Sequence, residues 1–253
     1  MSLPQHRLCF DIGRGSSRLV EIPTLLMTHG HLDHSSGIPY HVSQRNLRRL
    51  PTTKIFVPPP LEPPLRKILQ LWSEIEDYEI QYDLIPVDYE RTYPLAGNLH
   101  FQAIRSVHRV PSNGYTILEQ VRKLRDEFKQ LPGPEIARLK NIRDDLFYDS
   151  VVPHITFSGD TQIEFVLDNE LVRRSKVLFL ECTFICEERP VARARQWGHI
   201  HLDEIVAHAE AFRDVERLFL IHFSPRYRKD RIHATLKKKL PDWLHAKTVP
   251  FLL

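Results

Sequence analysis

Residues 24–34, TLLMTHGHLDH, bring three histidines and one aspartate together directly after a short apolar run. Neutral imidazole nitrogens and carboxylate oxygens are the ligands that zinc and similar divalent ions prefer. His29 and His31 are two residues apart, so an extended backbone points both side chains the same way. Asp33 and His34 follow the bend and can face a second centre. The stretch therefore predicts a metal site in a loop between a strand and a helix.

Further ligands are expected elsewhere in the chain, because one loop cannot complete two coordination shells. His108, Asp160 and His222 each follow an apolar run that is typical of a strand. A single histidine at such a position is more often structural than functional. Open α/β sheets, however, place their chemistry outside the carboxyl ends of the strands. The occurrence of all three side chains after separate strands predicts that they converge on one site.

The composition of the 253 residues is that of an ordinary globular protein, with 42% hydrophobic and 26% charged residues. It excludes a mainly disordered chain, a collagen-like chain and a disulfide scaffold. No stretch approaches the roughly 20 apolar residues of a membrane-spanning helix, so no membrane partner is expected. The three cysteines lack paired spacing and the first residues lack a secretory pattern. We therefore expect a cytoplasmic protein.

Short apolar runs alternate with amphipathic segments along the chain, which predicts an α/β layer architecture. No repeat or linker divides the sequence, so residues 1–253 are expected to form a single domain. The main helices are expected at residues 36–50, 61–75, 161–169, 202–212 and 229–240. Residues 120–150 are rich in charge and poor in strand-forming residues, and they are expected to be an insertion. The first expected strand begins soon after Met1, which leaves open an edge strand or hairpin upstream.

The net charge is only +3, but basic residues gather near the C-terminus, where residues 226–239 hold seven of them. A local positive field favours a polyanionic partner over a neutral one. The alternative interpretation is an ordinary solvated helix face.

The order of motifs along nearly the whole chain resembles that of the metallo-β-lactamase-fold hydrolases. The HxHxDH motif of residues 29–34 is specific to that superfamily. The ECTF of residues 181–184, the GH of residues 198–199 and the HFSPRY of residues 222–227 are more similar to the ribonuclease Z branch, the tRNA 3′-end endonucleases. The resemblance implies a four-layer αββα sandwich with mixed sheets. It also implies a hydrolase in which a hydroxide held by two metal ions attacks phosphorus.

The same resemblance implies a set of metal ligands. The cofactor would be two divalent ions, with zinc as the first choice and manganese or iron as alternatives. His29, His31 and His108 would hold the first ion, and Asp33, His34 and His222 would hold the second. Asp160 would bridge the two ions.

The other implied roles concern proton transfer and support of the site. By resemblance, Asp33 would orient or deprotonate the attacking water, and His199 would protonate the leaving oxygen. Glu181 would either orient His199 or serve packing. From its place after a strand, Asp11 can hydrogen-bond a ligand histidine or cap a turn. Arg226 is a candidate phosphate ligand, and a surface ion pair is its alternative.

Residues 120–150 lie where the family carries its tRNA-gripping arm. The segment contains Gly133-Pro134, but it is short and mixed in charge. It is therefore expected to be either a reduced arm or a lid. The leading hypothesis is a phosphodiesterase resembling ribonuclease Z that acts on tRNA precursors, with a homodimer as the family's frequent state. The alternatives are a small-molecule phosphodiesterase or other ester hydrolase, and a non-catalytic RNA-binding protein with a vestigial metal site.

Overall fold

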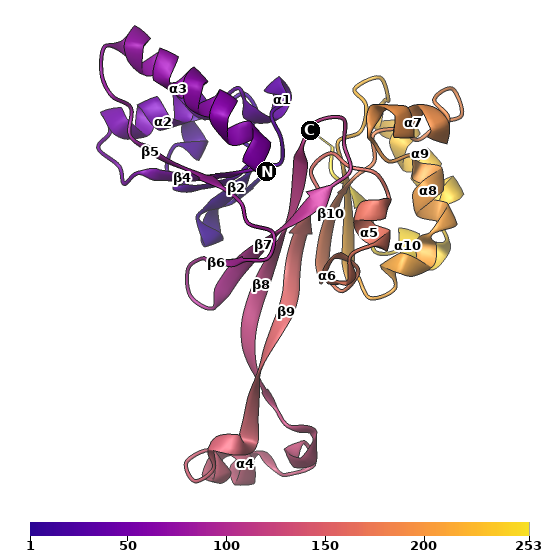
Figure 1. The fold of residues 1–253 in the computed structure, drawn as a ribbon. Helices are drawn as coiled ribbons and strands as arrows, with labels where there is room; N and C mark the ends of the chain where they lie inside the picture. Colours follow the sequence, from indigo (N-terminus) through magenta and orange to yellow (C-terminus); the bar gives the residue numbers. More distant parts are fainter. Residues whose placement is uncertain (253) are drawn as a thin grey trace.

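The computed structural model describes residues 1–252, which form two β-sheets packed face to face (Figure 1). The strands of the first sheet, in order across it, are β1 (Ser2–Leu3), β2 (Leu8–Phe10), β3 (Thr24–Leu26), β4 (Thr53–Val57) and β5 (Tyr82–Pro86). The strands of the second sheet, in order across it, are β12 (Thr248–Pro250), β11 (Arg217–Ile221), β10 (Val177–Glu181), β9 (Phe147–Phe157), β8 (Ser112–Leu124), β7 (Leu99–Ser106) and β6 (Thr92–Pro94).

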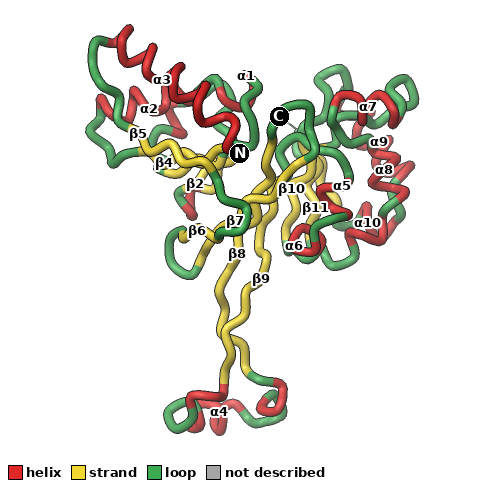
Figure 2. Tube along the Cα trace, in the orientation of Figure 1, coloured by secondary structure: helices red, strands yellow, loops and turns green. Residues whose placement is uncertain are grey.

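Helices cover the outer faces of both sheets, which gives the four αββα layers expected from the sequence (Figure 2). The helices on the side of the first sheet are α1 (Leu32–Ser35), α2 (Ile38–Leu47) and α3 (Glu62–Glu76). Those on the side of the second sheet are α5 (Glu164–Leu167), α6 (Glu170–Arg173), α7 (Val191–Trp197), α8 (Leu202–Ala207), α9 (Lys229–Lys239) and α10 (Asp242–His245). The remaining helix, α4 (Gly133–Leu139), stands apart from both layers.

The first sheet is parallel from β2 to β5 and is buried on both faces. Cys9 and Leu25 pack against the apolar sides of α2 and α3, whereas Leu8, Phe10 and Leu26 face the second sheet. Side chains of successive strand residues point to opposite faces of the sheet, so they contribute to different cores. A strand buried on both faces needs a continuous apolar run, and residues 24–27 supply one.

The second sheet is antiparallel from β6 to β9 and parallel from β9 to β12. Leu178 and Leu220 point toward α5–α10, whereas Phe179 and Phe219 stack between the sheets with ring centroids 4.7 Å apart. Both sheets thus contribute aromatic side chains to the shared inner core. The carboxyl ends of β9, β10 and β11 lie side by side at one edge of this sheet, because these strands are parallel.

Strands β8 and β9 extend beyond the sheet as a two-stranded arm that carries α4 at its far end (Figure 1). Their pairing continues as far as Leu124 and Phe147, past a register shift between Ile117 and Leu118. Residues 120–150 were expected to contain few strand residues. That expectation is wrong for the two ends of the segment, which belong to β8 and β9. Outside the sheet the strands have no core to face, so their polar side chains do not show the alternating pattern of a half-buried strand.

The helices differ from the expected ranges mainly in length. The segment expected as a helix at residues 36–50 is helical over α2 only, with the short α1 just before it, and the segment at 161–169 is helical only over the four residues of α5. The helix expected at residues 61–75 matches α3, with Pro63 in its first turn, where its missing N–H costs nothing. Within residues 1–252, no helix combines the length and the apolar character needed to cross a membrane.

Candidate metal centre

The loop after β3 carries the HxHxDH residues to the edge where both sheets end. The backbone N–H of Asn113 donates to the Thr28 carbonyl at 2.8 Å, which fixes the loop to the second sheet. His29 is completely buried, and His31 caps the start of α1 in an extended conformation. Asp33 and His34 then lie in the first turn of α1. The bend between strand and helix thus separates the two pairs, as the sequence predicts.

Side chains from several strand ends meet this loop and form two groups of potential metal ligands. Within each group the ligand atoms lie within 4.8 Å of one another. The first group is His29, His31, His108 and Asp160, and the second is Asp33, His34 and His222. His108 follows β7, Asp160 follows β9 and His222 follows β11. The structure therefore brings together every side chain that the sequence analysis named as a metal ligand.

Asp160 lies between the two groups and faces both. Its Oδ2 is 3.7 Å from His29 Nε2 and 4.0 Å from His108 Nε2. Its Oδ1 is 3.6 Å from His34 Nε2 and 3.5 Å from His222 Nε2. Each carboxylate oxygen thus faces the imidazoles of a different group. This is the arrangement that a carboxylate bridging two cations requires.

Asp11 fixes the orientation of two of these imidazoles. Its carboxylate accepts hydrogen bonds from the backbone N–H and the hydroxyl of Thr28, at 2.7 and 2.8 Å. It also accepts from His34 Nδ1 at 2.8 Å. Because the Thr28 hydroxyl donates to Asp11, its oxygen is left to accept from His29 Nδ1 at 2.9 Å. Both histidines therefore turn their Nε2 lone pairs toward the centre, which is the support a ligand histidine needs.

Glu181 repeats this arrangement on the second sheet. Its carboxylate accepts from His199 Nδ1 at 2.8 Å and from the Thr183 hydroxyl at 2.8 Å. The Thr183 oxygen then accepts from His222 Nδ1 at 2.9 Å. Each of the two buried carboxylates thus holds one imidazole directly and a second one through a threonine. The hydrogen bond to His199 favours orientation over packing for Glu181.

Three backbone features bear on the support of the centre. His108 Nδ1 donates to the carbonyl oxygen of Gly198 at 2.8 Å, which leaves its Nε2 free. Gly159, just before Asp160, has φ of +60°, and a Cβ there would lie 2.6 Å from the Thr28 Cβ. Glycine is therefore required at this position. His222 itself adopts a left-handed φ of 60°, a cost that its hydrogen bond and its packing must offset.

The electrostatics of the cluster fit a site for divalent cations. Burial, reinforced by the nearby His34 and His108, lowers the pKa of His29 to about 2, so this imidazole keeps its lone pair. Burial also favours the neutral form of His222, but the carboxylates of Asp33 and Asp160 outweigh it and raise the pKa to about 9, so a metal ion bound there would take the place of this proton. Neutral imidazoles and ionised carboxylates are the donor set that zinc, manganese and iron accept. The residues present therefore fit a pair of divalent ions.

The remaining predicted residues lie outside the two main groups. His199 also lies within 4.8 Å of Asp160 and His222 in ligand-atom distance, so it borders the centre. Arg226 is exposed in the loop between β11 and α9, and it forms no ion pair with any carboxylate of residues 1–252. The ion-pair alternative for Arg226 thus has no support. Sequence reasoning missed the roles of Thr28 and Thr183, although Thr28 directly precedes His29 and Thr183 lies within the ECTF motif.

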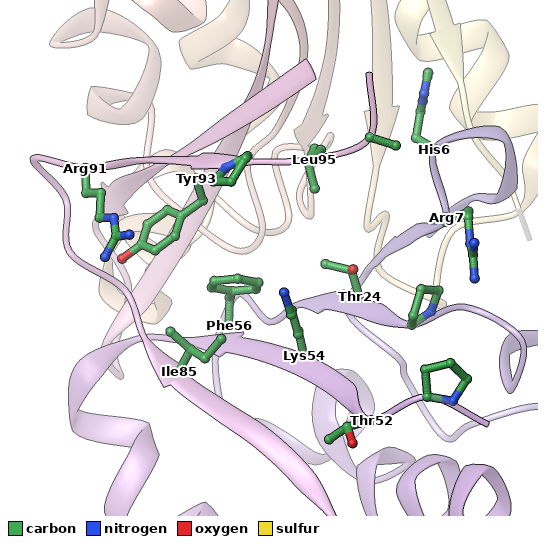
Figure 3. A pocket seen from close by; sticks show the side chains of 14 residues that line it. His6, Arg7, Thr24, Thr52, Lys54, Phe56, Ile85, Arg91, Tyr93 and Leu95 are labelled. Carbon is green, nitrogen blue, oxygen red and sulfur yellow. The ribbon is translucent and has the colours of Figure 1, made fainter. Parts of the chain in front are cut away.

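A pocket of the protein lies away from this cluster. It has a volume of about 810 Å³ and opens at the amino ends of β3 and β4, the opposite ends from the metal cluster (Figure 3). Phe56 and Tyr93 form its apolar wall, and Lys54 and Arg91 lie at its margin. The residues that line it include no carboxylate and none of the candidate ligands. The candidate ligands therefore lie at the strand-end cluster, away from this pocket.

Comparisons with known proteins agree with this geometry. No protein-family model matches the chain. It is 34% identical over 250 residues to the chloroplastic tRNase Z TRZ2 of Arabidopsis thaliana, covering 98% of this chain and 70% of the relative. It is 33% identical to tRNase Z TRZ1 of the same plant, covering 88% and 80%. Two crystal structures share the fold.

One is the metallo-β-lactamase-fold protein YhfI of Bacillus subtilis, with a TM-score of 0.62, 15% identity and coverage of 97% of this chain and 84% of that one. The other is the short form of human tRNase Z, with a TM-score of 0.57, 21% identity and coverage of 87% and 82%. The order of motifs, the αββα layers, the paired ligand groups and the two plant relatives lead to one conclusion. The chain belongs to the ribonuclease Z family, which consists of hydrolytic endoribonucleases with the metallo-β-lactamase fold.

Proposed function

We propose that the protein hydrolyses a phosphodiester bond of tRNA precursors at a centre of two divalent metal ions. One observation carries the proposal: Asp160 turns one carboxylate oxygen to each of two groups of imidazoles. His29, His31 and His108 would hold one ion, and Asp33, His34 and His222 would hold the other. When bound, such ions supply Lewis-acid charge and lower the pKa of a shared water. Zinc is the first candidate, with manganese and iron as alternatives.

The chain's own residues would position the reactants. Asp33 has a largely exposed carboxylate, so it can accept a hydrogen bond from a water that approaches the centre. His199 receives its orientation from Glu181, and its Nε2 is left free to give a proton to the departing oxygen. Asp33 and His199 would thus act on the attacking and the leaving oxygen respectively. Arg226, exposed and without a carboxylate partner, would bind a phosphate of the substrate.

The arm formed by the outer parts of β8 and β9 would contact RNA away from the scissile bond. It presents basic side chains, but several of them are paired with acidic neighbours. Arg122 lies near Asp149, and Arg143 near Asp145. These exposed pairs are weak and salt-sensitive, so phosphates of RNA can replace the carboxylates as partners. We propose that residues 120–150 act as a reduced RNA-binding arm.

Cleavage assays test this function directly. The protein loaded with zinc or manganese should release the 3′ trailer from a precursor tRNA and should cleave unstructured RNA less efficiently. The same preparation should also hydrolyse bis(p-nitrophenyl) phosphate, because the centre acts on any accessible phosphodiester. Hydrolysis of the small phosphodiester with no cleavage of any RNA would favour the alternative, a small-molecule phosphodiesterase. The pairing of basic with acidic side chains in the arm is the observation that favours this alternative.

The exposed face of α3 favours a homodimer. Leu65 and Leu69 of this helix face the core, and a second apolar stripe faces outward, consisting of Ile68, Leu71, Trp72 and Ile75. Two copies of α3 that pack antiparallel about a twofold axis would cover both stripes. They would also bring Lys67 near Glu74 of the other copy, and neither forms an ion pair within residues 1–252. Sedimentation should show a dimer for the wild type and a monomer for Leu71→Glu.

The cellular compartment stays a prediction. All three cysteines are free and buried, in keeping with a reducing environment. A relative at 34% identity is named as chloroplastic, however, so the similarity to known proteins does not identify the compartment.

A further inference from the structure

An exposed tryptophan lies beside the metal centre and has no part in the proposed chemistry. Trp197 is the last residue of α7 and is 41% exposed, whereas most large aromatic side chains of the second sheet are buried. It is separated from His199 by only one residue. Two arginines lie over its indole ring. The Arg109 guanidinium carbon is 4.6 Å from the ring centroid, and that of Arg193 is 5.2 Å away.

The backbone fixes this cluster rigidly to the centre. Arg109 directly follows the candidate ligand His108, and Trp197 directly precedes Gly198, whose carbonyl accepts the hydrogen bond from His108. A Cβ on Gly198 would lie 2.8 Å from His108 Nδ1 and 3.0 Å from the Arg109 nitrogen, so the two segments are in close contact. The cluster of Arg109, Arg193 and Trp197, here called the tryptophan platform, therefore keeps a fixed position relative to His199.

The charges of the tryptophan platform are not neutralised by the protein. Within residues 1–252, neither Arg109 nor Arg193 forms an ion pair with a carboxylate, and the guanidinium group of Arg193 donates only to the side-chain oxygen of Gln196, at 2.9 Å. Arg195 on the same helix is different, because it pairs with both Glu164 and Glu204. The two guanidinium groups on the platform are thus held over an aromatic ring and still available to an external anion.

We propose that the tryptophan platform binds the nucleotide on the leaving-group side of the scissile phosphate. The proposal rests on the proposed function, because it names a subsite for the same substrate. A base can take the place of a guanidinium group on the exposed indole, and the guanidinium groups, which have no carboxylate partner, can bind the adjoining phosphate. The side of the bond follows from position: His199 would protonate the leaving oxygen, and Trp197 lies two residues before it. The platform would thereby hold the leaving ribose against its proton donor.

A second tryptophan of similar surroundings provides a matched control. Trp243 in α10 has Arg213 and Lys247 over its ring, at 4.2 and 5.0 Å from the centroid. Trp243 is only partly exposed and packs against the helix-side core, and Arg213 is paired with Glu210. Arg213 is therefore already paired, unlike Arg109 and Arg193, and none of the residues of this stack is a candidate ligand. Arg213→Ala should leave RNA cleavage and phosphodiester hydrolysis unchanged.

Kinetics of platform variants test the proposal. Trp197→Leu keeps apolar bulk but removes the aromatic face, and it should lower kcat/KM for a precursor RNA by roughly tenfold, the effect expected for one lost base stack. The loss for bis(p-nitrophenyl) phosphate should be several times smaller. Trp197→Phe should restore part of the RNA activity. Wild-type RNA activity in Trp197→Leu, or an equal loss on both substrates, would overturn the proposal.

Binding without metal separates this inference from the proposed function. The probe is a short single-stranded oligouridylate, added to protein in EDTA at low salt. Base stacking should quench the wild-type tryptophan fluorescence more than that of Trp197→Phe, and Arg109→Ala/Arg193→Ala should reduce the difference. Equal quenching of the two proteins would exclude the platform. If the wild type cleaves no RNA but shows this specific quenching, the proposed function fails and the platform stands.

Discussion

The metal centre and the arm differ in how their polar groups are held. In the centre, Asp11 and Glu181 are 7% and 0% exposed, and each accepts hydrogen bonds that orient two imidazoles. In the arm, both members of the pair between Arg122 and Asp149 are largely exposed. Buried hydrogen-bonded groups are costly to disturb, whereas exposed ion pairs contribute little and weaken with salt. The polar groups of the centre are therefore fixed before substrate binds, whereas those of the arm can exchange their partners.

This contrast indicates that the reaction and the choice of substrate are encoded separately. Changes in the centre should affect every phosphodiester, and changes in the arm should affect RNA alone. The two substrates used above, a precursor tRNA and bis(p-nitrophenyl) phosphate, distinguish the regions.

The largest effect is expected for Asp33→Ala. The substitution removes a member of the second ligand group and the carboxylate that would orient the attacking water. We expect kcat to fall by roughly a thousandfold on both substrates, within the range found for loss of an acid–base group. The exposed Asp214 offers a matched control, and Asp214→Ala should retain full activity. Loss of activity on RNA with normal hydrolysis of the small substrate would show that Asp33 is not part of the metal centre.

Asp11→Asn tests the support behind the ligands. The amide keeps the shape of the side chain but loses the charge that holds His34 and, through Thr28, His29. Metal affinity should fall by about 10- to 100-fold, measured by competition with a chromogenic chelator. Asp83→Asn changes an exposed carboxylate of β5 and should have no effect. An unchanged affinity in Asp11→Asn would leave a turn cap as the role of Asp11.

Removal of the arm should affect only the larger substrate. Gln120 and Val151 are paired across β8 and β9, so an Asn-Gly turn can join them in place of residues 121–150. We expect kcat/KM for precursor tRNA to fall by roughly tenfold, with a smaller dependence on salt, because phosphate contacts are lost. Hydrolysis of bis(p-nitrophenyl) phosphate should not change. Full RNA activity in the shortened protein would show that the arm does not bind substrate.

The smallest effect on activity is expected at a buried histidine outside both regions. Burial, with Arg45 nearby, lowers the pKa of His41 from about 6.5 to about 4. The unfolded chain therefore binds a proton between these pH values that the native protein does not, and stability falls as the pH falls. From pH 7 to pH 5 the loss should be about 2 kcal/mol. In urea unfolding, His41→Leu should remove this loss without changing activity, and an unchanged pH dependence would contradict the assignment.

The sequence predicts the centre better than its surroundings. The ligands could be named because imidazoles and carboxylates follow recognisable apolar strands, and strand ends meet at one edge of a sheet. The roles of Thr28 and Thr183 could not be predicted, because a hydroxyl becomes a relay only when a carboxylate and an imidazole converge on it in space. Trp197 was equally hidden, since its neighbour Arg109 lies in a distant part of the chain.

The segment of residues 120–150 was predicted as a reduced arm or a lid, but its strands were missed for a related reason. Its strands pair with each other beyond the sheet, so none of residues 119–124 is buried. The hydrophobic alternation that marks a strand is a consequence of burial on one face. Where pairing alone holds two strands together, composition carries little information about them. The αββα layers, by contrast, follow from strands and helices whose apolar faces are all covered.

Anomalous diffraction at the zinc edge from crystals grown with zinc tests the central claim most directly. The account predicts two peaks in each chain, one beside His29, His31 and His108 and the other beside Asp33, His34 and His222, with Asp160 between them. A single peak away from Asp160, or an empty cluster in crystals soaked with zinc, manganese or iron and measured at the corresponding edge, would contradict it.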